Sequence, residues 1–155
     1  MDIYEIVNEP EKQLEIFSDI IKKMNNIGDY EETLVNIISE IKNIMLTDTI
    51  LLYLIDQELF NLNYEMSIGP LGSKFFGSII DGEKPLSVRA YTTSSSLYSN
   101  NPQDDSAFIP IKEILGEDLK NILFVPLKAR KRNIGALFLI NKKDGKFIET
   151  DTIIM

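Results

Sequence analysis

Residues 122–151 constrain the fold more than any other part of the sequence. The apolar segment 122–127 (ILFVPL) is followed by the charged segment 128–132 (KARKR), and residues 134–140 (IGALFLI) are again apolar without interruption. Two apolar segments of strand length on either side of a short polar segment are typical of a β-hairpin. The sequence therefore predicts two antiparallel strands joined by a basic turn.

Two small residues stand in the otherwise bulky second strand of this predicted hairpin. Gly135 and Ala136 leave space beside the backbone that a larger side chain would fill. We therefore expect either a helix or a bound molecule to approach the strand closely at this point.

The segment after the hairpin carries a polar pattern with two interpretations. Lys142 and Asp151, brought together at the base of a sheet, would form a structural ion pair that fixes a strand to the start of a helix. Alternatively, Lys142, Lys143 and Lys146 are simply solvated on a turn around Asp144-Gly145. For the individual lysines we favour the second interpretation.

These features together resemble the C-terminal half of a GAF domain. That family has a strand ending in V-P-L, a turn, a strand I-G-A/V-L-x-L-x-N, and F-x3-D at the start of a last helix. The matching residues are Val125, Pro126, Leu127, Ile134, Gly135, Ala136, Leu137, Asn141, Phe147 and Asp151. Cyclic-nucleotide-binding members carry the signature N-K-(x)n-F-x3-D-E, and this sequence has Thr152 in place of the final Glu. The resemblance therefore implies the fold far more than a cyclic-nucleotide ligand.

The composition is that of a single soluble domain. The 155 residues are 44% hydrophobic and 26% charged, which suits one compact α+β core. No apolar segment approaches the roughly 20 residues that span a bilayer, and the acidic N-terminus is unlike a signal peptide. We therefore expect a cytoplasmic protein that does not bind membranes.

Charge is distributed unevenly along the chain. The net charge of −8 disfavours binding to nucleic acid. Nevertheless, eight of the sixteen basic residues lie between Lys120 and Lys146, together with one acid, Asp144. This segment would form either a patch for an acidic partner or, more commonly, a hairpin edge that lysines protect from aggregation.

The sequence contains no Cys and no His. It therefore lacks the usual ligands of structural zinc, iron–sulfur clusters and haem, and it cannot attach a bilin through a thioether. Three known uses of GAF domains are thereby excluded: chromophore attachment, haem-based gas sensing through His, and methionine sulfoxide reduction by Cys chemistry. Cys–His and Ser–His catalysis are excluded as well, and we expect neither an enzyme nor a cofactor.

The N-terminal third predicts two helices and two strands. A first helix over residues 14–27 has apolar positions at helical spacing, namely Leu14, Phe17, Ile20, Ile21, Met24 and Ile27. Its stripe is wide enough to cover a sheet and also meet a partner, so we expect a homodimer. A second helix begins with Asp29 as its cap, and strands follow at residues 49–55 and 62–68, the latter with one buried and one solvated face. These elements match the N-terminal half of a GAF domain.

The middle of the chain is where a ligand would bind. Residues 74–81 predict a short helix and 85–89 a short strand, while 90–110 predicts a polar loop that covers a site or is disordered. The adjacent Phe75 and Phe76 cannot both face the core, so one of them would line a pocket. The candidate ligand-binding residues are Phe75, Phe76, Arg89, Tyr91, Thr92 and Tyr98.

Arg89 has two interpretations. Its guanidinium could hold a carboxylate or phosphate with two hydrogen bonds. The commoner alternative is a surface salt bridge to a nearby acid such as Asp81 or Glu83.

We therefore expect a single GAF-like α+β domain over residues 1–155. It would have a central antiparallel sheet of five to six strands, N-terminal helices on one face, and a pocket covered by a helix or loop on the other. The short segment after Asp151 resembles a shortened last helix and suggests a fragment of a larger signalling protein. The resemblance implies a bacterial-type regulatory domain that senses a small, anionic molecule and signals through helix packing. The alternative is a homodimerisation module that binds no ligand; a PAS fold fits the sequence less well.

Overall fold

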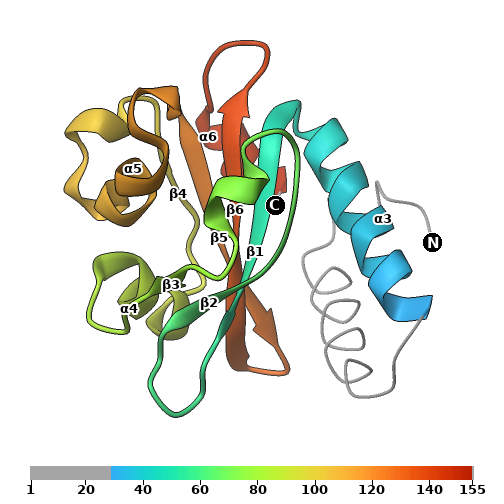
Figure 1. The fold of residues 1–155 in the computed structure, drawn as a ribbon, viewed down its shortest axis with the longest axis vertical. Coiled ribbons are helices and arrows are strands. Elements are labelled where there is room, and N and C mark those ends of the chain that lie inside the picture. The colour runs from blue at the N-terminus through green and yellow to red at the C-terminus, as the bar shows by residue number, and fades with distance from the viewer. Residues whose placement is uncertain (1–28, 155) are drawn as a thin grey trace.

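The computed structural model describes residues 29–154 as a six-stranded antiparallel sheet with helices on both faces (Figure 1). The strands lie in the order β3-β2-β1-β6-β5-β4. Their bounds are Thr47–Ile55 (β1), Leu62–Ile68 (β2), Ile79–Ile80 (β3), Leu97–Ser99 (β4), Ile122–Ala129 (β5) and Arg132–Lys142 (β6). The helices are Asp29–Ile44 (α3), Pro85–Thr92 (α4), Ile109–Leu115 (α5) and Glu149–Ile154 (α6). This confirms the predicted α+β fold with its central antiparallel sheet.

The predicted hairpin is β5 and β6, joined by the two residues Arg130 and Lys131. The pairing runs from Ile122 opposite Ile140 to Ala129 opposite Arg132. Strand β1 pairs along the other edge of β6, so β6 is hydrogen-bonded on both sides over most of its length. The hairpin therefore forms the centre of the sheet.

Gly135 is required by the neighbouring strand. A Cβ atom at this position would collide with the backbone carbonyl oxygen of Tyr53 in β1. The expected close approach is therefore real, but the approaching group is a strand backbone rather than a helix or a bound molecule. Sequence reasoning did not consider this source, because the pairing of β1 with β6 joins segments that are far apart in the chain.

The sheet separates two apolar cores. On one face, α3 packs Leu34, Ile38 and Ile41 against the sheet. On the other face, α4, α5 and the short 3-10 turns cover a cluster that contains Phe75 and Phe108. Helix α3 confirms the helix that was predicted to begin at Asp29. The other predicted helix, over residues 14–27, lies outside the described residues.

Strand β2 does not have one buried face as predicted. Leu52 pairs with Met66 and Tyr53 with Tyr64, so Glu65 is an extra residue in β2. Such a bulge reverses the direction in which the following side chains point. Accordingly Tyr64 packs with the α4 and α5 core, and Met66 packs with the α3 core.

Two predictions for the middle of the chain are wrong. Residues 74–81 do not form a helix: a 3-10 turn spans Gly72–Phe75, Gly77 has a positive φ of 71°, and β3 follows. Residues 85–89 form not a strand but the first part of α4, with Pro85 in its first turn. Proline suits that position because its missing N–H has no helical partner there.

The segment 90–110 is more ordered than the polar loop that was predicted. It contains the end of α4, the edge strand β4, and 3-10 turns at Pro102–Asp104 and Ser106–Phe108. Strand β4 pairs with β5 through Leu97, Tyr98 and Ser99. Phe108 is fully buried, as expected for a residue that anchors this segment.

Lys142 and Asp151 form a structural ion pair. Lys142 Nζ lies 2.8 Å and 2.9 Å from the two carboxylate oxygens of Asp151, and the two side chains are only 11% and 8% exposed. Asp151 also accepts a hydrogen bond from the backbone N–H of Ile148. The favoured interpretation of a solvated lysine is therefore wrong for Lys142, whereas Lys143 and Lys146 are exposed as expected.

We expect Lys142→Met to lower the free energy of unfolding by about 3 kcal/mol, because it leaves the Asp151 carboxylate buried without its partner. Urea denaturation checks this, with Lys143→Met as the matched control. That control removes an exposed neighbouring lysine and should change stability by less than about 0.5 kcal/mol. Equal effects of the two substitutions would contradict a structural role for the pair.

Tyr53 gives a second stability prediction. Burial raises the pKa of its hydroxyl from 10.0 to about 12, and a hydrogen bond with Ser78 Oγ partly opposes this. Since the folded state keeps the proton longer than the unfolded state, its stabilising contribution is complete below pH 10 and is lost as the pH rises toward 12. Chemical denaturation should show a decrease of about 3 kcal/mol, which Tyr53→Phe removes and Tyr98→Phe leaves in place.

Candidate functional site

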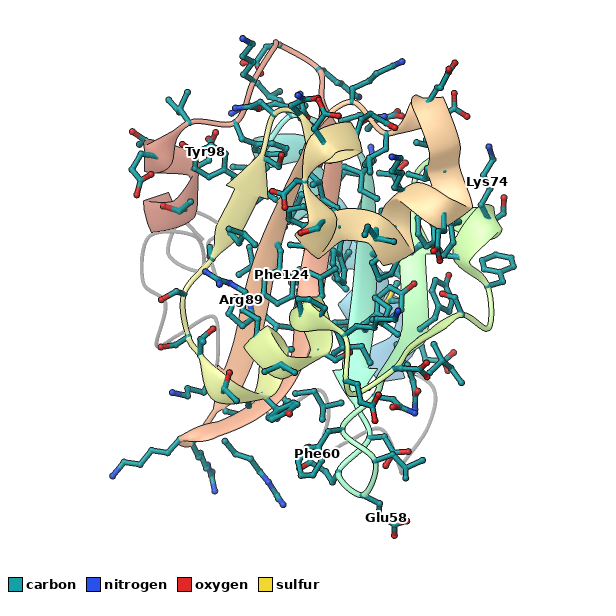
Figure 2. The ribbon with its side chains drawn as sticks, turned by 90° about the vertical axis from the view of Figure 1, so that its left-hand side faces the viewer. Glu58, Phe60, Lys74, Arg89, Tyr98 and Phe124 are labelled. Atoms are coloured by element: carbon teal, nitrogen blue, oxygen red, sulfur yellow. The ribbon has the colours of Figure 1, made fainter. Side chains whose placement is uncertain are left out.

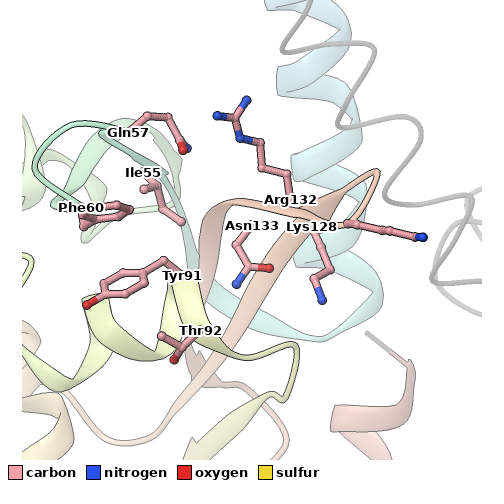
Figure 3. A pocket seen from close by; sticks show the side chains of 9 residues that line it. Ile55, Gln57, Phe60, Tyr91, Thr92, Lys128, Arg132 and Asn133 are labelled. Atoms are coloured by element: carbon pink, nitrogen blue, oxygen red, sulfur yellow. The ribbon is translucent and has the colours of Figure 1, made fainter.

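A cleft of about 360 Å³ opens where the β1–β2 loop, the end of α4 and the β5–β6 turn meet (Figure 3). We call it the basic cleft. It is lined by Ile55, Gln57, Phe60, Tyr91, Thr92, Lys128, Lys131, Arg132 and Asn133. Its volume lies near the lower end of the roughly 300–1,000 Å³ found for small-molecule sites.

Three of the lining side chains are cationic and none is acidic. Lys128, Lys131 and Arg132 all come from the β5–β6 hairpin. Among residues 29–154, the salt bridges are Lys74–Asp118 and Lys142–Asp151, so none of these three cations has an acidic partner. The cleft therefore has a local positive potential in a chain whose net charge is −8.

Local hydrogen bonds hold the walls of the cleft in place. Asn133 Nδ2 donates to the backbone carbonyl of Thr93, at 3.2 Å, and so ties β6 to the end of α4. Asp56 shapes the β1–β2 loop, because its Oδ1 accepts from the backbone N–H of Glu58 at 2.9 Å. A different hydrogen bond thus positions each of these segments of the cleft.

Two aromatic rings form the wall opposite the cations. The ring centroids of Phe60 and Tyr91 are 4.8 Å apart, with their planes tilted by 44°. Figure 3 shows this ring pair on one side, Lys128 and Arg132 on the other, and Asn133 between them. The Tyr91 hydroxyl points away from Asn133.

The turn that carries the cations has an unusual backbone. Arg130 and Lys131 have φ values of 50° and 68°. Positive φ at both positions is typical of a type I′ hairpin turn, which Asn-Gly adopts readily, whereas residues such as Arg and Lys adopt it at a cost of about 1 kcal/mol each. The sequence thus places cations where turn stability alone favours Asn and Gly.

The structure brings together only part of the set of candidate ligand-binding residues. Tyr91 and Thr92 line the basic cleft. Phe75 is fully buried in the core. Phe76 is 68% exposed, and its ring contacts that of Tyr64. Tyr98 packs with the α3 core on the opposite face, and Figure 2 shows it far from Phe60. Of the six candidates, Tyr91 and Thr92 therefore share the basic cleft, and residues 74–81 do not supply the helix that was expected to cover a pocket.

Arg89 matches neither of its two interpretations in full. Within residues 29–154 it forms no salt bridge, so the expected pairing with Asp81 or Glu83 is absent. Its Nε atom is buried without a hydrogen-bond partner in the described part of the chain. However, Arg89 does not line the basic cleft, and Figure 2 places it well apart from Phe60.

A second cavity of about 360 Å³ lies between β3 and α5. It is lined by Ser78, Ile79, Ile80, Asp81, Lys84, Pro110, Glu113 and Ile114. Its single cation stands beside two acids, so it has no preference for an anion. The basic cleft is therefore the better candidate for a charged ligand.

Within the described residues, no group of three Asp or Glu side chains is placed to hold a metal ion. The same part of the chain has no helix long and apolar enough to cross a membrane.

Sequence reasoning missed most of the basic cleft. The signal was present in the four cations of residues 128–132, which were interpreted as a solvated hairpin edge. Gln57 and Phe60 gave no signal, because only the fold brings the β1–β2 loop opposite this turn.

Comparison with known proteins establishes the fold. No protein-family model and no curated protein sequence matches the chain. Among solved structures, the GAF domain of a phosphoenolpyruvate-protein phosphotransferase from Coxiella burnetii has a TM-score of 0.66 at 18% identity, covering 90% of this chain and 83% of that one. The GAF domain of a two-component sensor histidine kinase from Bacillus halodurans has a TM-score of 0.61 at 21% identity, covering 77% of this chain and 82% of that one. The chain therefore adopts the GAF-domain fold, as the sequence predicted.

Two further structures with this fold differ in what they do. The NreA protein of Staphylococcus aureus, which has a nitrate-binding site, has a TM-score of 0.62 at 16% identity, covering 79% of this chain and 95% of that one. The free methionine-R-sulfoxide reductase of Neisseria meningitidis has a TM-score of 0.61 at 20% identity, covering 78% and 68%. At these identities the similarity concerns the fold alone.

The positive φ of Lys131 yields a prediction with a matched pair of variants. Lys131→Gly and Lys131→Gln both remove the charge, but only glycine relieves the backbone strain. We expect Lys131→Gly to be more stable than Lys131→Gln by about 1 kcal/mol in urea denaturation. Equal stabilities would show that the turn is not strained at this position.

Proposed function

We propose that this chain is a regulatory, non-catalytic domain that senses a small anionic ligand in the basic cleft and signals to an output domain through helix packing. The fold supports the regulatory part, because GAF domains of a phosphotransferase and of sensor histidine kinases share it. The nitrate-binding site of NreA, a protein with a similar fold, supports the choice of an anionic ligand.

The observation that carries this proposal is a set of three cations, in a ligand-sized cleft, that form no salt bridge with an acid within residues 29–154. Like charges that share a cleft repel one another, so an anion that enters removes this repulsion as well as forming its own contacts. The guanidinium of Arg132 is suited to a planar, two-point grip on a carboxylate, nitrate or phosphate. The cleft therefore favours an anion over a neutral ligand.

The arrangement also suggests how binding would be transmitted. The cations belong to the β5–β6 hairpin, whereas Tyr91 and Thr92 belong to the end of α4. A ligand that contacts both walls stabilises one position of α4 relative to the sheet. It increases the population of molecules with α4 in that position only to the extent that it binds them more tightly than the others. The bond from Asn133 to Thr93 is the existing link that such a shift would change.

A non-catalytic role fits the residues of the cleft. They offer no carboxylate, thiol or imidazole for acid–base or nucleophilic chemistry at neutral pH. The two lysines and the arginine of the cleft are suited to binding an anion.

Titration of the labelled protein with inorganic phosphate and with nitrate, followed by backbone NMR, tests the proposal. We expect shifts in residues of the cleft, and we expect Arg132→Gln to weaken phosphate binding about tenfold or more through loss of a charge-assisted hydrogen bond. Lys146→Gln is the matched control, because it removes an exposed cation from the opposite end of the hairpin.

Arg89→Gln separates the two arginine sites. If it abolishes phosphate binding while Arg132→Gln has no effect, the anion binds under α4 near the buried Nε of Arg89 and the proposed cleft is wrong. If neither anion causes shifts and the protein sediments as a dimer, the alternative of a ligand-free homodimerisation module is favoured.

A further inference from the structure

We infer that the basic cleft selects an anion that is carried on a planar ring, rather than a simple inorganic anion. The inference rests on the proposed function and adds the class of ligand. The wall of the cleft opposite the cations is formed by the ring pair of Phe60 and Tyr91.

The position of Phe60 is not explained by packing of the protein alone. Its side chain is 44% exposed, and its backbone φ is 60°, a conformation that aromatic residues rarely adopt. A ring that served only to anchor the β1–β2 loop would be buried in the core, as Phe108 is. Phe60 instead contacts Tyr91 and leaves part of its surface open to the cleft.

The two walls are complementary to two parts of one molecule. The rings lie opposite Lys128 and Arg132 across the cleft (Figure 3). A planar ring gains favourable stacked or edge-to-face contacts with Phe60 and Tyr91. An anionic group attached to that ring is then directed toward the cations. The amide of Gln57 and the Oδ1 of Asn133, which has no hydrogen-bond partner in the described part of the chain, are available for hydrogen bonds along the sides.

The volume limits the size of the ligand. About 360 Å³ suits one small molecule and is near the bottom of the range for such sites. A ligand with one ring system and one anionic group fills both halves of the cleft. An inorganic anion would contact the cations alone and leave the aromatic wall exposed to water.

Three probes test the inference by calorimetric titration of the intact chain: inorganic phosphate, cyclohexyl phosphate and phenyl phosphate. We expect phenyl phosphate to bind roughly tenfold more tightly than the other two, because only its ring is both planar and aromatic. Tyr91→Leu and Phe60→Leu should each reduce the ratio of the affinity for phenyl phosphate to the affinity for inorganic phosphate, because each removes one ring of the aromatic wall. Phe60 is partly exposed, so its variant remains informative if Tyr91→Leu does not fold.

Phe76→Leu is the matched aromatic control, because Phe76 is exposed at the far edge of the sheet and does not line the cleft. It should retain the full preference for phenyl phosphate. Equal affinities for the three probes, all weakened by Arg132→Gln, would overturn this inference and leave the proposed anion site intact. Absence of binding by inorganic phosphate and phenyl phosphate would instead overturn the proposed function.

Discussion

Pairing of β6 along both of its edges is the constraint on which the other features depend. Its eleven residues extend over roughly 35 Å, with Arg132 in the basic cleft at one end and Lys142 in the ion pair with Asp151 at the other. Gly135 permits β1 to approach, and that pairing places the β1–β2 loop opposite the hairpin turn. A larger residue at 135 would therefore disturb the cleft as well as the sheet.

A strand held on both sides has little freedom to change shape, so the mobile parts of any switch must lie around it. In the proposed function these parts are the β1–β2 loop with Phe60 and the end of α4 with Tyr91. Neither segment belongs to the centre of the sheet, and the rings of Phe60 and Tyr91 connect the two segments. A ligand that contacts both would change their position against a fixed reference, which is how a rigid sheet can report binding.

The sequence predicted those parts of the fold that local patterns determine. The hairpin, β1 and β2 followed from their apolar segments, and the ion pair between Lys142 and Asp151 was one of two interpretations of the final motif. The bulge at Glu65, the helix at Pro85 and the assembly of the cleft were not predicted. The bulge and the cleft depend on contacts between distant segments, whereas the short apolar spacing of α4 is compatible with either a helix or a strand.

The same distant contacts explain why an acidic protein can present a cationic site. At physiological ionic strength the Debye length is about 8 Å, so exposed acids elsewhere on the surface are largely screened from the cleft. Lys128, Lys131 and Arg132 are close to one another and to any ligand between them, and they act together at short range. Because such partly exposed contacts are themselves weakened by salt, in the proposed site the charges would give the preference for an anion, whereas the aromatic wall would supply binding energy that salt does not screen.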